Sequence, residues 1–332
     1  MNTILNIDNL SVDFNTEYGA LHAVDSVSYT VSRGQVVGIV GESGCGKTVT
    51  ALAVMRLLDN VVGASTKGTI LFEGQDLLSL TKKQMHKVRG KEIAMIFQEP
   101  MTSLNPILTI GRQITEVLEL HLKMTPKQAR GRAAELLDLV GFSDPYQRLN
   151  DYPQQLSGGM RQRVMIAMAI SCNPKLIIAD EPTTSLDVTI QAQILDLIMD
   201  ISVKLGTALM LITHNLGLIA RYTEKVIVMY AGSVVEEGMA NQIYYDSHHP
   251  YTLGLLKAVP RIDGDIKEKL ITIEGIPPEQ TDQLIGCSFE PRCIYSVDKC
   301  KIETPEISSI QKNHVASCWQ SMELEKIRSK HS

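Results

Sequence analysis

Residues 41–48 read Gly41-Glu42-Ser43-Gly44-Cys45-Gly46-Lys47-Thr48, directly after the apolar run Val36-Val37-Gly38-Ile39-Val40. The glycines let the backbone wrap so that successive N–H groups point at an anion, while Lys47 adds a positive charge for the β- and γ-phosphates. Thr48 offers a hydroxyl to Mg²⁺, and the helix-forming residues 49–58 place a helix N-terminus under the phosphates. Strand, loop and helix in this order predict an α/β fold whose loop residues bind a nucleoside triphosphate, with contacts from Gly41, Ser43, Gly44, Cys45, Gly46, Lys47 and Thr48.

A second apolar segment ends in two carboxylates, Leu176-Ile177-Ile178-Ala179-Asp180-Glu181. Together with the helix-forming residues 190–205 and the apolar residues 209–212, it predicts a strand–helix–strand unit of a parallel sheet. Because the carboxyl ends of parallel strands face the ligand crevice, we expect both acids to meet the nucleotide. Asp180 is then expected to hold Mg²⁺, and Glu181 to polarise a water for attack on the γ-phosphate.

The composition is that of an ordinary globular protein. The 332 residues are 44% hydrophobic and 21% charged, enough for about two domains. The net charge of −5 argues against a nucleic-acid partner, since proteins that neutralise phosphates usually carry a basic excess. The sequence has neither a long uncharged apolar run nor a basic, then apolar, N-terminus. We therefore expect no membrane span and no secretory signal, and a cytosolic chain whose cysteines are reduced thiols or metal ligands.

Further regions surround the predicted parallel core. Short alternating strands in residues 5–40 and a hairpin-like piece at 68–74 predict an antiparallel β subdomain. Apolar residues at helical spacing predict a helical subdomain at about residues 81–155. A strand pair, 226–230 and 233–235, completes a nucleotide-binding domain of residues 1–245. Clustered prolines and four cysteines then mark a C-terminal extension, residues 246–332.

A second glycine-rich segment reads Leu156-Ser157-Gly158-Gly159-Met160 and precedes the helix-forming residues 164–171. Ser157 and the two glycines offer a hydroxyl and bare N–H groups at a helix N-terminus. This segment resembles the Leu-Ser-Gly-Gly-Gln signature of the ATP-binding cassette (ABC) family, with Met160 in place of Gln. Over about the first 245 residues the resemblance implies an ABC nucleotide-binding domain of the P-loop NTPase (RecA-like) class. It also implies head-to-tail pairing with a second cassette, whose ATP would meet Ser157, Gly158 and Gly159 of this chain.

The same resemblance assigns roles to residues elsewhere. Gln98 matches the glutamine that reaches Mg²⁺ and the attacking water, and His214 matches the histidine that contacts the γ-phosphate. Ser185-Leu186-Asp187 matches the segment that crosses between cassettes. Asn215 stands where these proteins often have Asp, which puts a neighbouring salt bridge in doubt. Phe14 falls where an aromatic ring stacks on adenine; Tyr18 is its competitor, and a core position in a small sheet is the ordinary alternative.

Three local stretches resemble the D-type ATPase subunit of oligopeptide/dipeptide permeases: residues 93–106, 249–260 and 286–293. The resemblance implies an ATPase that powers import of di- or oligopeptides from the cytoplasmic face of the membrane. It further implies a second ATPase subunit, two integral membrane permease subunits and an extracytoplasmic solute-binding protein. An importer of nickel, glutathione or another small solute is the first alternative. A non-transport ABC ATPase is the second, although such proteins usually carry two fused cassettes or a long coiled coil.

Four cysteines lie close together in the extension: Cys287, Cys293, Cys300 and Cys318. The paired C-x₂-C knuckles typical of zinc ribbons are absent from their spacing, whereas four thiolates on loosely spaced loops suit a [4Fe–4S] cluster. The family resemblance also points to a [4Fe–4S] cluster. Zinc is the alternative, and plain structural thiols are the third possibility. Either metal group would act as a staple for a segment with little core of its own.

Cys45 occupies the middle of the predicted phosphate loop. Backbone N–H groups and the neighbouring Lys47 are expected to favour its thiolate and so to raise its reactivity. We therefore expect alkylation of Cys45 to block ATP binding and prior MgATP to protect it.

Overall fold

The computed structural model describes residues 3–17, 19–99, 103–184, 186–258, 273–278 and 285–324. They form two compact units. The first comprises residues 3–4, 31–35 and the described part of 76–211, and the second comprises the described parts of 5–30, 36–75 and 212–332. The predicted domain boundary at residue 245 does not coincide with this division, because residues on both sides of it belong to the second unit. The extension therefore shares a compact unit with the phosphate loop.

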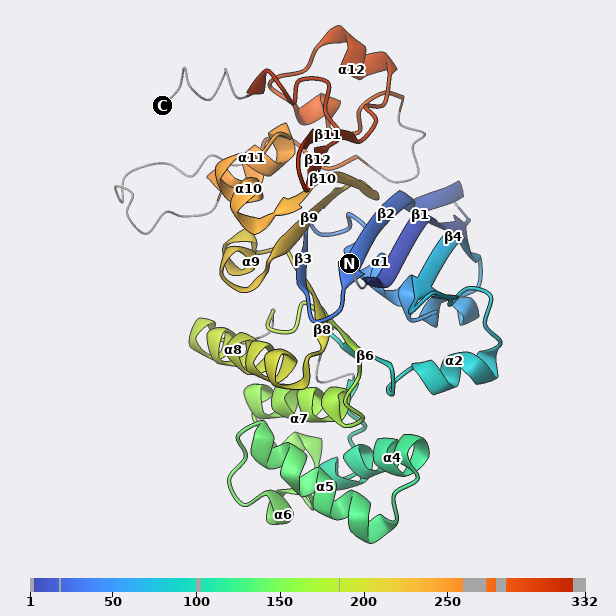
Figure 1. Ribbon diagram of the computed structural model, residues 1–332, viewed down its shortest axis with the longest axis vertical. Helices are drawn as coiled ribbons and strands as arrows, with labels where there is room; N and C mark the ends of the chain where they lie inside the picture. The colour runs from blue at the N-terminus through green and yellow to red at the C-terminus, as the bar shows by residue number, and fades with distance from the viewer. Residues whose placement is uncertain are drawn as a thin grey trace. The chain divides into compact units, whose positions relative to one another are not determined.

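A four-stranded sheet occupies one side of the second unit, in the order β2-β1-β4-β5 (Figure 1). Its strands are β1 (Thr3–Thr16), β2 (Gly19–Ser32), β4 (Ala64–Phe72) and β5 (Gln75–Asp76). We predicted short strands here, but β1 and β2 each run for 14 residues. A shift in the β1–β4 register between Asp8 and Ser11, where Asn9 has a φ of 49°, lets β1 continue as a bulged strand.

The second sheet of this unit carries the phosphate loop. Strand β3 (Val36–Val40) is buried along its whole length and runs parallel to β9 (Lys225–Tyr230), which pairs antiparallel with β10 (Ser233–Met239). Strand β12 (His314–Ala316) pairs with β10, and β11 (Ser308–Gln311) pairs with β12. The C-terminal extension thus adds two strands to the sheet that leads into the phosphate loop.

The helices of the second unit are short. They are α1 (Lys47–Val54), η1 (Leu57–Asn60), α9 (Leu216–Tyr222), α10 (Ala240–Tyr245), α11 (Pro250–Lys257), η3 (Glu290–Arg292) and α12 (Asp298–Ile302). The helix predicted over residues 49–58 begins two residues earlier and ends at Val54, where a turn leads into η1.

The first unit combines a parallel strand pair with helices. Strands β6 (Ile93–Ile96) and β7 (Leu176–Asp180) pair in parallel. Its helices are α2 (Lys82–Val88), α4 (Ile110–Leu122), α5 (Pro126–Leu139), α6 (Pro145–Arg148), η2 (Pro153–Gln155), α7 (Gly158–Ile170) and α8 (Val188–Leu205). Strand β8 (Ala208–Thr213) carries the chain from this unit into the second. None of the described helices combines the length and apolarity needed to cross a membrane.

Strand β6 lies inside the predicted helical subdomain, residues 81–155, and is a correction to it. Ile93, Ala94 and Ile96 are all buried, so the segment lacks the alternation that marks a half-exposed strand. A short apolar run buried on both faces cannot be told from a helix segment by periodicity alone. The helices α4 and α5 do begin at predictable caps, because Thr109 and Thr125 accept hydrogen bonds from the N–H groups of Arg112 and Gln128.

Candidate functional site

The phosphate loop joins β3 to α1 in the predicted order. Gly46 is the N-cap of α1 and adopts a left-handed φ of 98°, which favours glycine. A Cβ atom at Gly46 would lie 2.6 Å from the carbonyl oxygen of Ala23, and one at Gly41 would lie 2.2 Å from that of Met229. Close backbone approach therefore requires both glycines. Ser43, Gly44 and Thr48 are exposed and form the open side of the loop.

Lys47 lies folded back against this loop. Its side chain is buried, and Nζ donates hydrogen bonds to the carbonyl oxygens of Gly41 at 2.8 Å and Glu42 at 2.9 Å. The ammonium group is thus held by two backbone carbonyl groups near the N-terminus of α1. A triphosphate would compete with those two carbonyls for the same charge.

Cys45 does not have the character predicted for it. Its thiol is 4% exposed, and burial raises its pKa more than the adjacent Lys47 ammonium lowers it. The expectation of a favoured thiolate is wrong, because desolvation of the charged form outweighs one nearby cation. Cys45 is a packed residue beneath the loop, with its sulfur 3.7 Å from Lys47 Nζ.

Two of the predicted catalytic residues, Glu181 and Gln98, belong to the first unit, as does the predicted Mg²⁺ ligand Asp180. Asp180 ends β7 and is buried, and Glu181 follows it with a left-handed φ of 44°. One carboxylate oxygen of Glu181 accepts hydrogen bonds from Gln98 Nε2 at 3.1 Å and from the Thr184 hydroxyl at 2.8 Å. The structure therefore brings Gln98 and Glu181 together, although they are far apart in the sequence. Strained backbone at a carboxylate fixed by two donors is typical of functional sites.

The signature segment begins α7. The Ser157 hydroxyl accepts a hydrogen bond from the N–H of Met160 at 3.3 Å and so caps the helix. Ser157 and Gly158 are exposed, whereas Gly159 is half-buried, and a Cβ there would lie 3.0 Å from a methyl of Ile190. The hydroxyl proton of Ser157 and the exposed helix N-terminus together form a surface that accepts an anion.

The remaining predicted nucleotide contacts lie in the second unit. His214 is exposed directly after β8, and the side chain of Asn215 accepts a hydrogen bond from the Leu218 N–H as the N-cap of α9. Asn215 therefore has a capping role, which an Asp could also fill. Phe14 is half-exposed on β1 opposite Ala64. Its competitor Tyr18 and the predicted crossing residue Ser185 lie outside the described residues.

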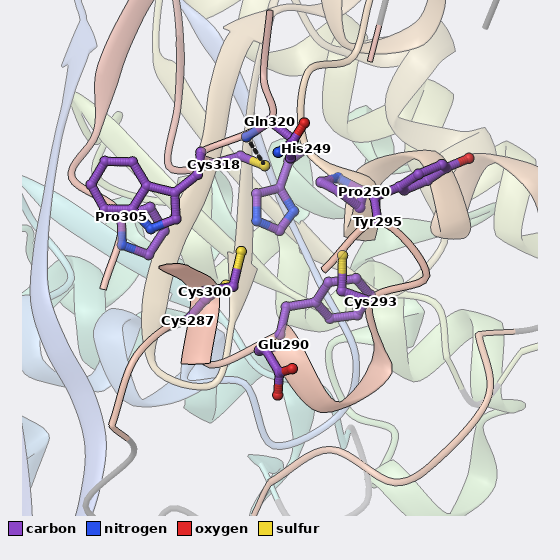
Figure 2. Close-up of a pocket in the computed structure, with 12 residues that line it drawn as sticks. His249, Pro250, Cys287, Glu290, Cys293, Tyr295, Cys300, Pro305, Cys318 and Gln320 are labelled. Atoms are coloured by element: carbon purple, nitrogen blue, oxygen red, sulfur yellow. Dashed lines mark hydrogen bonds between the residues drawn. The ribbon is translucent and has the colours of Figure 1, made fainter. Parts of the chain in front are cut away.

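The four cysteines of the extension line one hollow. Figure 2 shows Cys287, Cys293, Cys300 and Cys318 around a shared space, beside His249. Burial raises the pKa of Cys287, and it raises that of Cys293 to about 11 and that of Cys318 to about 12. The neighbouring thiols push the pKa of Cys318 in the same direction. A cation-bearing group would reverse this preference for neutral thiols.

Sequence reasoning assigned no role to Thr184, Glu42, Tyr251 or Arg292. Thr184 follows Glu181 by three residues, a spacing that a turn brings together. Glu42 and Arg292 form an ion pair across 250 positions of sequence, and the Tyr251 hydroxyl accepts a hydrogen bond from the N–H of Glu42. Nothing local in the sequence indicates either of these long-range contacts.

Known proteins are similar to this chain over nearly its whole length. A family model described as "ABC transporter" matches residues 24–184, and one described as "Oligopeptide/dipeptide transporter, C-terminal region" matches residues 235–300. The dipeptide transport ATP-binding protein DppD of Escherichia coli (strain K12) is 50% identical over 315 residues, covering 95% of this chain and 96% of the relative. The oligopeptide transport ATP-binding protein AppD of Bacillus subtilis (strain 168) is 49% identical over 319 residues, covering 96% and 97%.

A solved structure supports the fold. The "dimeric structure of a post-hydrolysis state of the ATP-binding cassette MJ0796 bound to ADP and Pi" matches with a TM-score of 0.63 and 27% identity. The match covers 71% of this chain and 98% of that one, so it accounts for a cassette and leaves further residues of this chain unmatched. With a phosphate loop, a signature helix and the C-terminal region in one sequence, this chain belongs to the ATP-binding proteins of the oligopeptide/dipeptide ABC transporter family.

Proposed function

We propose that this chain is the ATP-hydrolysing subunit of an importer of di- or oligopeptides. The observation that carries the proposal is similarity to peptide-transport ATP-binding proteins over 95% or more of the chain, phosphate loop and extension included. We place the chain at the cytoplasmic face of the membrane, with a second ABC ATPase, two integral membrane permease subunits and an extracytoplasmic solute-binding protein as its partners.

Nucleotide binding falls to the phosphate loop. Lys47 leaves the carbonyls of Gly41 and Glu42 for the phosphates, and the loop N–H groups from Ser43 to Thr48 complete the anion site. Phe14, with its half-exposed ring, is our candidate for stacking on adenine. We assign the Thr48 hydroxyl, the Asp180 carboxylate and the Gln98 amide oxygen to Mg²⁺, because this ion prefers oxygen ligands. When bound, Mg²⁺ neutralises charge on the phosphate oxygens.

Hydrolysis falls to the first unit and to His214. Glu181 takes a proton from the attacking water, and Gln98, which donates to the same carboxylate, orients that water. His214 contacts the γ-phosphate. The exposed Ser157 and Gly158, with Gly159, complete the ATP site of the partner ATPase, so a single chain supplies only part of each composite site.

Uptake experiments test the cargo. In a strain that lacks this chain, a plasmid-borne copy should restore uptake of a radiolabelled dipeptide or oligopeptide, and Lys47→Ala should not. Restored uptake of nickel or glutathione, with no effect on peptides, would replace the proposed cargo by the first alternative. Failure of the chain to co-purify with any membrane subunit would favour a non-transport ATPase.

We further propose that Cys287, Cys293, Cys300 and Cys318 hold a [4Fe–4S] cluster. The donor set is four thiols that line one hollow. Zn–S bonds of 2.3 Å would bring thiolates about 3.8 Å apart. The thiols do not form such a close group. Among the described residues, the potential metal ligands that lie within 4.8 Å of one another in a group of three or more are Asp246, His248 and His314. When bound, the cluster cross-links the segments that carry the thiols.

Metal analysis decides between the candidates for the cysteine site. Protein purified without oxygen should be brown and contain about four iron and four sulfide per chain, as a cubane requires. Stoichiometric zinc without iron would establish the zinc alternative, and neither metal would leave four structural thiols.

A further inference from the structure

Glu42, the second residue of the phosphate loop, is held through its side chain and its backbone. Its carboxylate accepts two hydrogen bonds from the guanidinium of Arg292, at 2.7 Å from Nη1 and 3.0 Å from Nη2. Its N–H donates to the Tyr251 hydroxyl at 2.8 Å, and its carbonyl oxygen accepts from Lys47 Nζ at 2.9 Å. The residue that holds Lys47 in place is therefore itself held by two residues of the C-terminal extension.

Arg292 is a rigid anchor for this contact. Its side chain is 5% exposed. Its remaining donors bond to the carbonyl oxygens of Glu274 at 3.0 Å and Ile273 at 3.4 Å and to the Tyr230 hydroxyl at 3.3 Å. The bidentate contact with Glu42 raises the pKa of Arg292, so the guanidinium stays charged. Planar, two-point pairing with a carboxylate fixes orientation as well as distance.

Both anchors belong to segments that line the cysteine hollow. Arg292 immediately precedes Cys293 at the end of η3, and Tyr251 follows His249 and Pro250 at the start of α11. Phe289, which also lines the hollow, packs its ring against those of Tyr230 and Tyr251, with centroids 5.2 Å and 5.4 Å away. Packed rings and a short turn thus connect the hollow to the phosphate loop within one compact unit.

We propose that Arg292 and Tyr251 are positioning residues for the phosphate loop, and that nucleotide binding and the cysteine segment are coupled through Glu42. With the Glu42 backbone fixed, the loop is preorganised and Lys47 has a defined place from which to meet phosphate. Without the anchors, the loop must be ordered at the moment of binding, which weakens affinity. Coupling of this kind is reciprocal, so nucleotide must in turn stabilise the cysteine segment. The inference rests on the proposed nucleotide site and is independent of the transported solute and of the metal.

Equilibrium binding of a fluorescent ATP analogue to the full-length chain tests the proposal. Arg292→Gln and Glu42→Gln should each weaken binding about tenfold, within the usual range of coupling between sites. The double variant should bind no more weakly than either single one, because both changes break the same pair. Arg292→Lys, which keeps the charge and loses the two-point geometry, should fall between. Lys301→Gln, which removes an exposed ion pair in the same segment, is the matched control and should bind like the parent.

Two readouts separate positioning from damage to the fold. General destabilisation lowers the fraction of protein that binds and leaves the Kd of that fraction unchanged, whereas lost positioning raises the Kd itself. In hydrogen–deuterium exchange, MgATP should slow exchange of residues 285–293 in the parent and should not in Arg292→Gln. Should Arg292→Gln fail to fold, Glu42→Gln and Tyr251→Phe probe the same contacts from the loop and from α11.

The coupling would be overturned if the folded Glu42→Gln and Tyr251→Phe variants bound the analogue with the Kd of the parent. It would also be overturned if the losses of affinity in the Arg292/Glu42 double variant were additive. Failure of the parent chain itself to bind the analogue would overturn the proposed nucleotide site instead. The two failures are therefore distinguishable.

Discussion

Glu181→Gln provides the sharpest test of the hydrolytic site. One carboxylate oxygen of Glu181 accepts from both Gln98 and Thr184. A glutamine can place its amide oxygen at this position and keep both bonds, so the substitution preserves the local geometry and removes the base. A general base contributes about 10² to 10⁴ in rate, which corresponds to about 3 to 5 kcal/mol of activation free energy. We expect kcat of the assembled transporter to fall by that factor and the Kd for MgATP to change less than about threefold.

The assay is steady-state phosphate release from the reconstituted complex, with nucleotide binding measured on the same preparation. Thr184→Val is the matched variant, because it removes one of the two donors to the carboxylate and leaves the base in place. Loss of one hydrogen bond of about 1 kcal/mol should lower kcat about fivefold. Hydrolysis by Glu181→Gln within tenfold of the parent rate would refute the assignment of Glu181 as general base.

Three further predictions concern the second unit. Because burial raises the pKa of Cys45, its thiol should be alkylated more slowly than a free thiol at neutral pH and faster as the pH rises past 9. MgATP should slow the alkylation further. A rate at pH 7 equal to that of free cysteine would contradict the raised pKa. Cys293→Ser should lose the iron and speed proteolysis within residues 285–324, whereas unchanged iron content would exclude Cys293 as a ligand. Glu236→Ala should lower the free energy of unfolding, measured in urea, by about 3 kcal/mol or more, since two backbone N–H groups and the His314 ring lose a buried acceptor; a loss below about 1 kcal/mol would show that water replaces it.

Contiguous sequence made the local structure of the phosphate loop predictable. The phosphate loop, its preceding strand and its following helix form one stretch of sequence, and each residue type has a local mechanical reason. The two carboxylates at the end of β7 were placed by the same logic, because strand direction alone decides where Asp180 and Glu181 lie. The structure adds that Gln98 donates a hydrogen bond to Glu181, whereas the family resemblance had assigned Gln98 only to Mg²⁺ and the attacking water.

Three features of the structure were not predictable from the sequence: the pKa of Cys45, the strand β6 and the ion pair of Glu42 with Arg292. At Cys45, the backbone N–H groups and Lys47 favour the thiolate, whereas burial favours the neutral thiol. The direction of the pKa shift therefore depends on how deeply the thiol is buried, which cannot be read from the sequence. Strand β6 was not predicted, because both of its faces are buried and its sequence therefore lacks the alternation of apolar and polar residues. The pair of Glu42 and Arg292 joins residues 250 positions apart, and each alone reads as an ordinary surface charge.

The C-terminal extension is packed into the same compact unit as the phosphate loop. Strand β12 extends the sheet through β10, and buried Glu236 on β10 accepts from the N–H groups of His248 and His249 and from the ring of His314. These contacts fix the start of α11, and with it Tyr251, relative to the sheet that ends in the phosphate loop. The same sheet therefore positions the loop and the residue that holds the Glu42 backbone. We therefore expect a perturbation of the cysteine hollow to reach the phosphate loop through the packed rings of Phe289, Tyr230 and Tyr251.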